Sequence, residues 1–363
     1  MTLIHVIPSG EWGGPERYAF DICRHFAAEG WQVKALTREA LAVDRHFRGA
    51  GIQVCHAPLR SYPDYYSARK LAALFRGMPK GEGVVHVHRL NDALTCILAR
   101  KMARRKDIRL ILTLHEATRA RNTLLRRIVY RGIDRLLFVS EYSKKTFLSR
   151  WRPSAGPLPE EKTGVSYNSL LGATPEQQEP PRGPLSAAYR GKLKPGKGIE
   201  TLIEAFGRLK DLRLRLQIIG KGKPDYVDSL RRRAHASGIT DRIDWIRNTE
   251  FAEDACRRVA FGVLPSEQPE AFGMANIEFM ASGRPQIATF AGAVPEVLEP
   301  EVDSLKIEPG DADGLAHAIR RLATDEALRA ELGRNAAERY NTLFAWPLFI
   351  RRIERWYRGE NID

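Results

Sequence analysis

Short apolar runs alternate with longer amphipathic segments along the first half of the chain. Runs of seven or eight residues rich in Val, Ile and Leu predict buried strands at 2–8, 31–37, 51–57, 83–89, 110–117 and 135–141. Two segments between them, 16–30 and 91–105, repeat apolar residues at helical spacing, and the first is expected to end at Gly30. Because buried strands that alternate with helices form a parallel sheet covered on both faces, the pattern predicts a doubly wound α/β domain.

The same alternation returns in the second half of the chain. Strands are predicted at 185–193, 214–220, 242–246, 258–266 and 285–290, and helices at 198–210, 226–238 and 275–283. We therefore expect a second parallel sheet of similar size. Because two such domains enclose a cleft and bind ligands at the carboxyl ends of their strands, the arrangement predicts a two-lobed enzyme.

Composition places the domain boundaries. Residues 170–186 are rich in Pro and Gln and lack apolar periodicity, which predicts a linker. We expect an N-terminal Rossmann-like domain at 1–172, the linker at 173–184 and a C-terminal Rossmann-like domain at 185–345. The final segment, 346–363, is amphipathic, and its apolar residues are spaced to pack against another surface.

Length and cysteine content exclude several classes of protein. The 363 residues suffice for two ordinary cores, and no apolar run approaches the ~18 residues of a membrane-spanning helix. The four cysteines lack C-x-x-C spacing, which argues against a zinc knuckle or a redox pair. The opening "MTLIHVIP" has neither a basic leader nor a cleavage site, so it is not expected to be a signal peptide, and the scattered cysteines fit reduced thiols in a cytoplasm.

The net charge of +14 lies entirely in the N-terminal half. Residues 1–172 carry 29 basic and 15 acidic side chains, whereas residues 173–363 carry 29 of each. This asymmetry indicates an anionic partner, such as a phospholipid surface, an acidic glycan or a nucleic acid, or else a solubilising surface without a partner.

A basic amphipathic helix is predicted in "RARNTLLRRIVYRGIDR", residues 119–135. Such a helix can lie on an anionic bilayer, grip an acidic acceptor or simply present a solvated arginine face over a core stripe. Lying on a bilayer would make the protein peripheral at the inner face of the cytoplasmic membrane. The candidate acceptor or membrane contacts are Arg119, Arg121, Arg126, Arg127 and Arg131.

Two glutamates lie eight positions apart in "PEAFGMANIEFMASGRP", residues 269–285. A helix is expected to begin near Phe272 and Gly273, where unpaired backbone N–H groups favour a phosphate or an oxyanion. Glu270 stands at the mouth of this helix and can accept hydrogen bonds from hydroxyl groups. Glu278 is flanked by apolar residues and needs a partner if it is buried, which a diol would supply. The alternative is a pair of ordinary helix glutamates.

Lysines and glycines mark two further turns. "YRGKLKPGKGIETLIEAF", residues 189–206, places Lys192 and Lys197 around a tight turn before a helix, and two such cations can neutralise a departing diphosphate. "IIGKGKP" adds Gly220 and Gly222 at the end of the next strand. Each turn alone is consistent with a solvated loop, but together the turns indicate a phosphate site at one edge of the sheet.

The N-terminal domain offers its own candidates. Gly13 and Gly14 follow the first strand and precede Pro15, which favours a first helical turn and a phosphate-tolerant loop. The loop lacks G-x-G-x-x-G and no acidic residue ends the second strand, which argues against a nicotinamide cofactor. His115 ends a strand, where it can bond a sugar hydroxyl or a carbonyl, or can be a structural histidine.

No metal is expected. His86 and His88 share one face of a predicted strand, but the sequence offers no evident third ligand. Asp311 and Asp313 form a D-x-D sequence, which holds a divalent metal in some nucleotide-sugar enzymes. Because they precede an amphipathic segment, helix capping explains them without a metal.

The second domain resembles the retaining, metal-independent family-4 glycosyltransferases of GT-B fold, of the "glycosyl transferases group 1" type. The shared motifs are "GKLKPGKG", "GKG", "EAFGMANIE" preceded by "PS", and the following "MASGRPQIATFAGAVPE". In the first domain "GGPERYAFDICRHFAAEGWQVKALT", "HVHR", "TLHEA" and "FVSEYSKK" fit in order, so the resemblance covers nearly the whole chain. It implies two Rossmann-like domains facing across a cleft, with the final helix crossing back to the first domain.

The resemblance also implies roles for individual residues. The two lysines would hold the donor diphosphate, Glu270 would bind the transferred sugar and Glu278 the ribose. The implied catalytic set is Glu270, Lys197, Lys192 and His115, the last in contact with the donor sugar. The implied donor-binding positions are Gly13, Gly14, Gly191, Gly220, Gly222, Phe272, Gly273, Met274 and Glu278.

The expected partners are a nucleotide sugar and an envelope glycan, lipopolysaccharide-type or lipid-linked acceptor, with no cofactor and no nucleic acid. Retention by front-face attack would let the diphosphate take the acceptor proton. Two positions depart from the family: Lys192 stands where arginine is usual, which loses a bidentate fork, and "YNSL" at 167–170 replaces the common N-G. A nucleotide-sugar epimerase or hydrolase of this fold, and a non-catalytic binder of nucleic acid or anionic membrane, are the alternatives.

Overall fold

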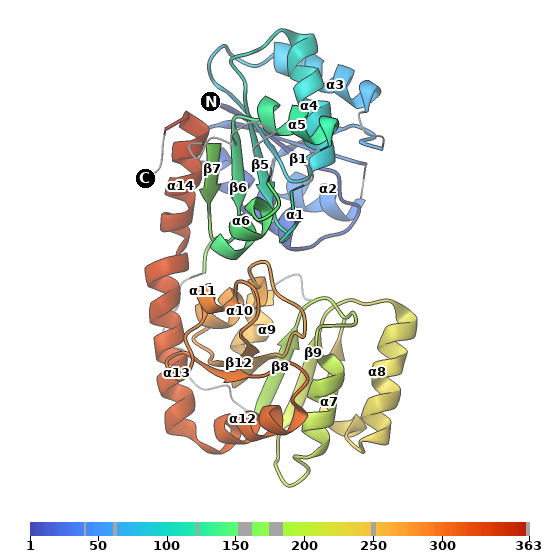
Figure 1. Ribbon diagram of the computed structural model, residues 1–363, viewed down its shortest axis with the longest axis vertical. Coiled ribbons are helices and arrows are strands. Elements are labelled where there is room, and N and C mark those ends of the chain that lie inside the picture. The colour runs from blue at the N-terminus through green and yellow to red at the C-terminus, as the bar shows by residue number, and fades with distance from the viewer. Residues whose placement is uncertain are drawn as a thin grey trace. The chain divides into compact units, whose positions relative to one another are not determined.

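The computed structural model describes residues 1–39, 41–60, 64–120, 123–151, 162–173, 184–247 and 252–360. They form two compact units (Figure 1). Unit 1 comprises Met1–Leu171 with Pro347–Asp363, and unit 2 comprises Gly172–Trp346. The predicted linker at 173–184 lies outside the described residues except at its two ends.

Unit 1 is built on one parallel sheet with the strand order β3-β2-β1-β4-β5-β6-β7. Its strands are β1 (Thr2–Ile7), β2 (Gln32–Thr37), β3 (Gln53–His56), β4 (Gly83–Val87), β5 (Arg109–Leu114), β6 (Arg135–Phe138) and β7 (Thr163–Val165). The six strands predicted in this half are confirmed. Strand β7 was not predicted, because three residues are too few to show a period.

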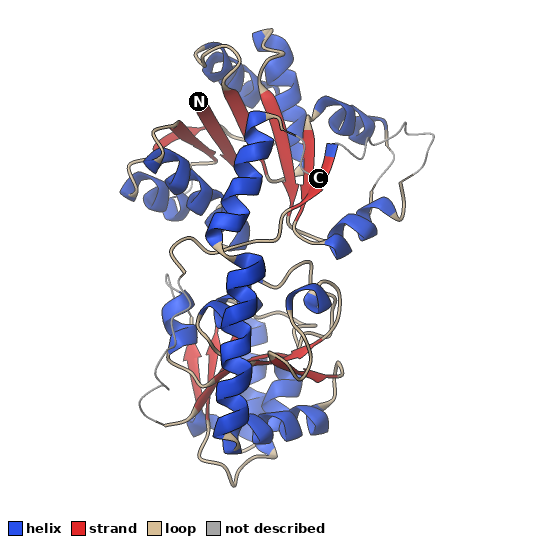
Figure 2. Ribbon diagram, turned by 90° about the vertical axis from the view of Figure 1, so that its left-hand side faces the viewer, coloured by secondary structure: helices blue, strands red, loops and turns tan. Residues whose placement is uncertain are grey.

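Helices cover both faces of this sheet (Figure 2). They are α1 (Gly14–Ala28), α2 (Leu41–Gly49), α3 (Tyr65–Arg76), α4 (Leu90–Ala103), α5 (Leu124–Gly132), α6 (Glu141–Leu148) and α14 (Trp346–Arg358). Helix α14 packs on the sheet through Trp356, whose ring fills the space that a side chain at Gly164 of β7 would need. Tyr357, the next residue, is completely buried in unit 1.

Unit 2 repeats the plan with the strand order β10-β9-β8-β11-β12-β13, again all parallel. Its strands are β8 (Ser186–Arg190), β9 (Arg215–Ile219), β10 (Ile243–Ile246), β11 (Phe261–Leu264), β12 (Gln286–Thr289) and β13 (Ser304–Ile307). Its α-helices are α7 (Ile199–Gly207), α8 (Pro224–Ala236), α9 (Ala252–Arg257), α10 (Met274–Ala281), α11 (Val294–Val297), α12 (Ala312–Thr324) and α13 (Glu326–Arg339). The π-helical turn Tyr340–Phe344 follows α13.

Helix capping accounts for the D-x-D sequence, as predicted. The side chain of Asp311 accepts a hydrogen bond from the backbone N–H of Gly314 at 2.8 Å and so caps α12. Asp313 forms an ion pair with Arg208. Both carboxylates therefore have partners within unit 2.

The strand order is that of a doubly wound fold in each unit, so the predicted α/β class is confirmed. Counted along the chain, the first strand of each sheet lies between the second and the fourth, and the direction of winding reverses there. The reversal falls between β1 and β4 in unit 1 and between β8 and β11 in unit 2. Loops that follow these strands separate at the carboxyl edge, and ligands of such sheets bind at this point.

Close backbone contacts explain the glycines in the turns after β8 and β9. The N–H of Gly191 donates to the carbonyl of Ile219 at 3.0 Å, and the N–H of Leu193 donates to the carbonyl of Lys221 at 2.7 Å. A side chain at Gly220 would overlap the carbonyl oxygen of Gly191. The two turns therefore continue the sheet beyond its strands, and they need glycine whether or not a ligand is bound.

We expect Gly198→Ala to destabilise unit 2 more than Gly310→Ala. Both glycines have a left-handed backbone, with φ of 68° and 75°. An added Cβ at Gly198 would overlap the backbone carbonyl of Pro265, whereas nothing lies within 4 Å of one at Gly310. Gly310→Ala should cost only the left-handed strain, roughly 1–2 kcal/mol, and Gly198→Ala should exceed it. Melting temperatures by circular dichroism measure both, and equal losses would contradict the contact with Pro265.

Candidate functional site

An ion pair between Lys197 and Glu270 joins the turn after β8 to the loop after β11. Lys197 lies just before α7, and the backbone carbonyl of Glu270 accepts a hydrogen bond from Ala293 N–H at 2.9 Å. Their side chains are 21% and 24% exposed, so both remain accessible to a ligand. Two predicted catalytic residues thus meet at the reversal point of the unit 2 sheet.

Further hydrogen bonds hold the loop after β11 against the same turn. The N–H of Glu267 donates to the carbonyl of Gly196 at 3.0 Å, and the hydroxyl of Thr201 donates to the carboxylate of Glu267 at 3.1 Å. Within the loop the hydroxyl of Ser266 donates to the carbonyl of Gln268 at 2.9 Å. The positions of Lys197 and Glu270 are therefore set by a network and not only by their own attraction.

Glu278 is buried and forms an ion pair with Arg190, the last residue of β8. The carboxylate side chain is only 7% exposed, so a cationic partner offsets the cost of taking it out of water. The predicted diol partner stays a prediction. Arg190 itself was missed, although its place beside Gly191 at the end of a buried strand is a signal that could have found it.

Helix α10 begins close to where the sequence predicted. Gly273 is its N-terminal cap, with a left-handed φ of 90°, and Met274 is its first residue. Phe272 before it is buried. The backbone N–H groups of this turn are the predicted contacts of a donor sugar or phosphate, and that role stays a prediction.

A pocket of about 210 Å³ adjoins the glycine turns at the carboxyl ends of β9 and β10. Its lining includes Leu193, Gly220, Gly222, Trp245 and Arg231, and the guanidinium of Arg231 lies 5.7 Å from the centre of the Trp245 indole. Pockets for whole drug-sized ligands measure roughly 300 Å³ or more, so this one suits a single ring system.

Lys192 lies in the turn after β8, next to Leu193 of the pocket lining and five residues before Lys197. Its side chain is exposed, and its backbone carbonyl accepts a hydrogen bond from the hydroxyl of Tyr189 at 3.2 Å. The structure therefore keeps this ammonium group in solvent, where it can move toward a ligand. Its predicted role at the diphosphate stays a prediction.

A carboxylate of the chain itself occupies the predicted phosphate loop of unit 1. Gly13 caps α1 and Gly14 is its first residue. Glu16 is buried and accepts hydrogen bonds from the backbone N–H of Gly13 and from its own N–H, while burial raises its pKa. The sequence analysis overlooked Glu16, and the predicted role of Gly13 and Gly14 at a phosphate stays a prediction.

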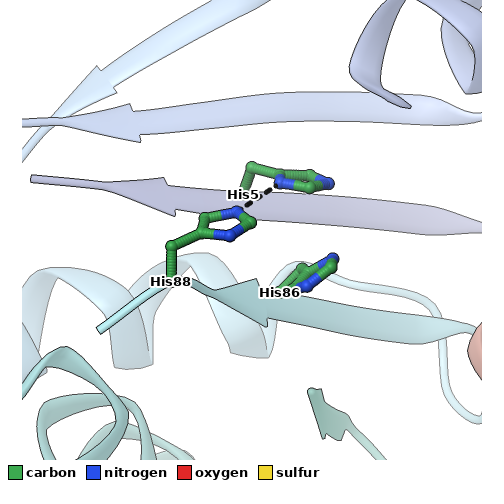
Figure 3. Close-up of side chains that lie close together, drawn as sticks. All are labelled: His5, His86 and His88. Carbon is green, nitrogen blue, oxygen red and sulfur yellow. Dashed lines mark hydrogen bonds between the residues drawn. The ribbon is translucent and has the colours of Figure 1, made fainter. Parts of the chain in front are cut away.

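Four histidines meet at the carboxyl ends of β1, β4 and β5. His5 of β1 lies beside His86 of β4, and His88 follows β4 (Figure 3). His115 follows β5. One ring nitrogen from each of His5, His86 and His88 lies within 4.8 Å of the other two. The expectation that no third ligand accompanies His86 and His88 was therefore wrong, because parallel pairing with β1 brings His5 to them.

Burial keeps these imidazoles neutral. It lowers the pKa of His5 to about 3 and that of His115 to about 4, and it holds the pKa values of His86 and His88 well below the usual value. The protonated neighbours that would form on titration repel one another and lower the pKa values further. A neutral His115 can donate one hydrogen bond and accept another, and it cannot act as a cation toward phosphate.

The predicted basic helix is confirmed as α5, and part of its apolar face is uncovered. Leu124 is 74% exposed, and Leu125 and Ile128 are each 41% exposed. Arg119 and Arg131 are exposed, Arg126 and Arg127 are half-buried, and Arg121 lies outside the described residues. Arg126 donates to the side chain of Asn91 of α4 at 3.2 Å, which fixes the helix on its neighbour.

Helix α3 also carries exposed aromatic side chains. Tyr65 and Tyr66 in its first turn are 62% and 59% exposed. The preceding residue, Asp64, donates its N–H to the hydroxyl of Thr95 of α4 at 3.3 Å, so α3 and α5 both begin beside α4. Among the described residues, no helix combines the length and the apolar character needed to cross a bilayer.

Two family models match the chain. Residues 12–168 match the model described as "Glycosyltransferase Family 4", and residues 173–339 match the model described as "Glycosyl transferases group 1". The first match falls in unit 1 and the second in unit 2.

Several curated relatives are similar in sequence. A D-inositol 3-phosphate glycosyltransferase of Xylanimonas cellulosilytica is 23% identical, and the alignment covers 95% of this chain and 93% of the relative. A GDP-mannose-dependent monoacylated alpha-(1-6)-phosphatidylinositol monomannoside mannosyltransferase of Corynebacterium glutamicum is 25% identical over 63% of each protein. An exopolysaccharide phosphotransferase of Streptomyces coelicolor is 31% identical over 46% of this chain but 18% of its own length. The chain thus spans less than two thirds of the last two relatives.

Solved structures share the fold. A glycosyltransferase from Rickettsia africae superposes with a TM-score of 0.83 at 18% identity, covering 99% of this chain and 98% of the other. Anabaena Alr3699/HepE in complex with UDP superposes with a TM-score of 0.81 at 19% identity, covering 99% of this chain and all of the other. At such identities the likeness establishes the fold alone.

The histidines predict how the stability of unit 1 changes with pH. In the unfolded chain histidine titrates near 6.5, so below that pH the unfolded state binds protons that the folded state does not take up. The buried neutral histidines should therefore contribute their full stabilisation above pH 6.5. Below that pH the free energy of unfolding should fall toward pH 4, by up to about 1.4 kcal/mol per pH unit for each histidine. Burial raises the pKa of Asp92 to about 6 and also raises the pKa of Glu16, and these two carboxyl groups oppose the effect.

Melting temperatures between pH 7.5 and 4.5 check this slope. A variant with His86→Gln should show a shallower slope, because one buried imidazole is gone. The exposed His317 provides the control, and His317→Gln should leave the slope unchanged. A melting temperature that does not fall below pH 6.5 would contradict the prediction.

Proposed function

The chain belongs to the GT-B glycosyltransferases of group 1, and from this premise we propose that it moves a sugar, with retention, from a nucleoside diphosphate to an envelope glycan or a lipid-linked acceptor. The observation that carries the proposal is the accessible ion pair of Lys197 and Glu270 at the reversal point of the unit 2 sheet.

The ion pair gives each partner a role in the reaction. A diphosphate carries more negative charge than one carboxylate, so it competes for the ammonium of Lys197 when the donor binds. Glu270 is then free to accept hydrogen bonds from hydroxyls of the transferred sugar. As the bond to the sugar breaks, charge grows on the diphosphate, and a lysine in contact with it stabilises the leaving group more than the substrate.

The nucleoside would occupy the neighbouring part of unit 2. The pocket at β9 and β10 has room for a base, and Trp245 offers it an aromatic edge. Glu278 would bind the ribose hydroxyls while Arg190 balances its charge. Named relatives use GDP-mannose and a named neighbour binds UDP, so the base is left to the experiment below.

We propose that transfer needs no metal. The lysines supply positive charge at the place where a divalent cation would act in other transferases. Both carboxylates of the D-x-D sequence are engaged, one in capping α12 and one with Arg208. A need for a metal would therefore have to be met by other groups.

The uncovered part of α5 supports a peripheral membrane contact. Exposed leucines beside arginines combine apolar insertion with attraction to anionic lipid headgroups, and the tyrosines of α3 suit the same interface. Such a contact would place a lipid-linked acceptor next to unit 1, and it accounts for the excess of basic residues there.

Ligand binding separates the roles of Lys197 and Glu270. We expect one of UDP, GDP, ADP, CDP and dTDP to raise the melting temperature, because a ligand at ~100 times its dissociation constant stabilises by ~2.7 kcal/mol, and EDTA should not alter the shift. Lys197→Met should weaken that diphosphate about tenfold or more. Glu270→Gln should bind the diphosphate normally but lose most of the further gain given by the nucleotide sugar. Turnover should fall by orders of magnitude in both.

Lys306→Met is the matched control, because Lys306 pairs with Glu308 on the surface of unit 2. Normal diphosphate binding by Lys197→Met would remove this lysine from the site. Sugar release without any acceptor would favour the hydrolase alternative, and a shift that EDTA abolishes would contradict metal independence.

Vesicle binding tests the membrane contact. We expect the protein to sediment with vesicles of phosphatidylcholine and phosphatidylglycerol at low salt but not with phosphatidylcholine alone. Leu124→Ser should reduce this binding roughly tenfold, because burying a leucine in the acyl boundary contributes about 1.5–3 kcal/mol. Leu343→Ser, at an exposed leucine of unit 2, is the control and should bind normally. Equal binding of both variants would contradict a role for α5.

A further inference from the structure

A single row of hydrogen bonds runs through the core of unit 1 and ends at His115. His86 contacts the hydroxyl of Thr113 through Nε2 at 2.7 Å and the hydroxyl of Tyr357 through Nδ1 at 2.6 Å. The same tyrosine hydroxyl contacts His5 Nε2 at 3.2 Å. The row therefore passes from β5 and β4 through α14 to β1.

Two more bonds complete the row. His5 Nδ1 lies 3.0 Å from His88 Nε2, the contact drawn in Figure 3, and His88 Nδ1 lies 3.0 Å from His115 Nε2. Every ring nitrogen of His5, His86 and His88 is thus engaged with a group of the chain itself. We call this row, from Thr113 to His115, the histidine array.

The array is better explained as a proton network than as a metal site. A zinc ion needs nitrogens about 2.0–2.1 Å away, and each of them must offer a free lone pair. The Tyr357 hydroxyl already stands where His5 Nε2 and His86 Nδ1 converge, and the remaining nitrogens are bonded to one another. A metal would have to displace this hydroxyl and break the bonds between the rings.

The proton count allows only two arrangements of the array. A neutral imidazole has one donor and one acceptor nitrogen, and a tyrosine hydroxyl has one proton. If the hydroxyl of Tyr357 donates to His5, then His5 Nδ1 donates to His88, and His88 Nδ1 donates to His115 Nε2. If the hydroxyl of Tyr357 donates to His86 instead, all the other bonds reverse: His115 Nε2 donates to His88, His88 Nε2 donates to His5, and His5 Nε2 donates to the hydroxyl. Mixed arrangements leave a buried donor or acceptor unsatisfied, at a cost greater than that of one ordinary hydrogen bond.

The two arrangements give His115 opposite chemistry at its other nitrogen. In the first, Nδ1 of His115 carries the proton and donates; in the second, Nδ1 accepts. We propose that Tyr357 is a positioning residue: the direction in which its hydroxyl donates, to His5 or to His86, is transmitted through the histidine array and sets the tautomer of His115, and hence the hydrogen bond that His115 offers to a sugar hydroxyl of the donor. The last step rests on the proposed function, whereas the control of the tautomer does not.

Tyr357→Phe is the direct test, because it removes the hydroxyl and retains the ring that packs against Phe26 and Trp31. Tyr130→Phe is the matched control: it removes another buried tyrosine hydroxyl of unit 1, and its ring packs against Phe147 and Trp151 instead of the histidines. Circular dichroism and melting temperatures establish that both variants fold.

Nitrogen-15 spectra of the histidine rings report the tautomer without any need for activity. We expect one tautomer of His115 in the unaltered protein and in Tyr130→Phe, and a mixture of both in Tyr357→Phe. For transfer, kcat should fall roughly tenfold in Tyr357→Phe with KM for the donor little changed, because binding is retained and only the direction of one hydrogen bond is lost.

Two results would overturn the proposal. The first is a folded Tyr357→Phe protein whose His115 spectrum matches that of the unaltered chain. The second is binding of one equivalent of Zn²⁺ by the unaltered protein with shifts of the His5, His86 and His88 signals, which would make the cluster a metal site. If the unaltered protein transfers no sugar at all, the proposed function fails while the spectra still decide the role of Tyr357. His88→Gln, which interrupts the array nearer to His115, should reproduce the change in tautomer if Tyr357→Phe proves unstable.

Discussion

Parallel pairing brings the carboxyl ends of all strands of a sheet to one edge, and the chemistry of both units depends on this constraint. In unit 2 it places the turn after β8 beside the loop after β11, so that Lys197 and Glu270 meet although 73 positions separate them. In unit 1 the pairing of β1 with β4 sets His5 next to His86, and the pairing of β4 with β5 brings His88 to His115. Each site is thus a consequence of strand order, to which the hydrogen bonds of the loop after β11 add in unit 2.

The edges differ in how their charges are balanced. In unit 2 the carboxylates of Glu270 and Glu278 pair with cations that belong to the turn after β8 or to β8 itself. In unit 1 Glu16 uses the amide groups at the start of α1, and the histidines remain neutral. Unit 2 is consequently suited to receive a dianionic group by exchange of partners, whereas unit 1 offers hydroxyl-binding groups without net charge at its histidines.

Much of this could be predicted from the sequence, because the relevant signals are local. Apolar runs indicate buried parallel strands, and glycines beside lysines mark turns that follow strands. The stretch 269–285 likewise indicates a helix start beside Glu270, and it contains α10. The sequence analysis missed Arg190, His5, Glu16 and Tyr357. The partners of His5 and Tyr357 lie far away along the chain, so no local period or spacing reveals them. Arg190 does have a local signal in its place beside Gly191, and Glu16 lies only three residues from its partner Gly13. Strand β7 was missed because three residues show no period. The spacing of residues in the sequence also does not predict which groups contact a donor, because this depends on the partner that each carboxylate already has.

Tyr357 also bears on how the chain acquires its structure during synthesis. Unit 1 leaves the ribosome first, yet the hydroxyl that closes its core comes from a helix made after the whole of unit 2; it is 352 positions from His5. Until α14 is made, the hydroxyl of Tyr357 is not there to bond His5 and His86. The hydrogen bonds inside unit 1 can therefore be completed only after unit 2 has been synthesised. Unit 1 is therefore complete only after all of unit 2 has been translated.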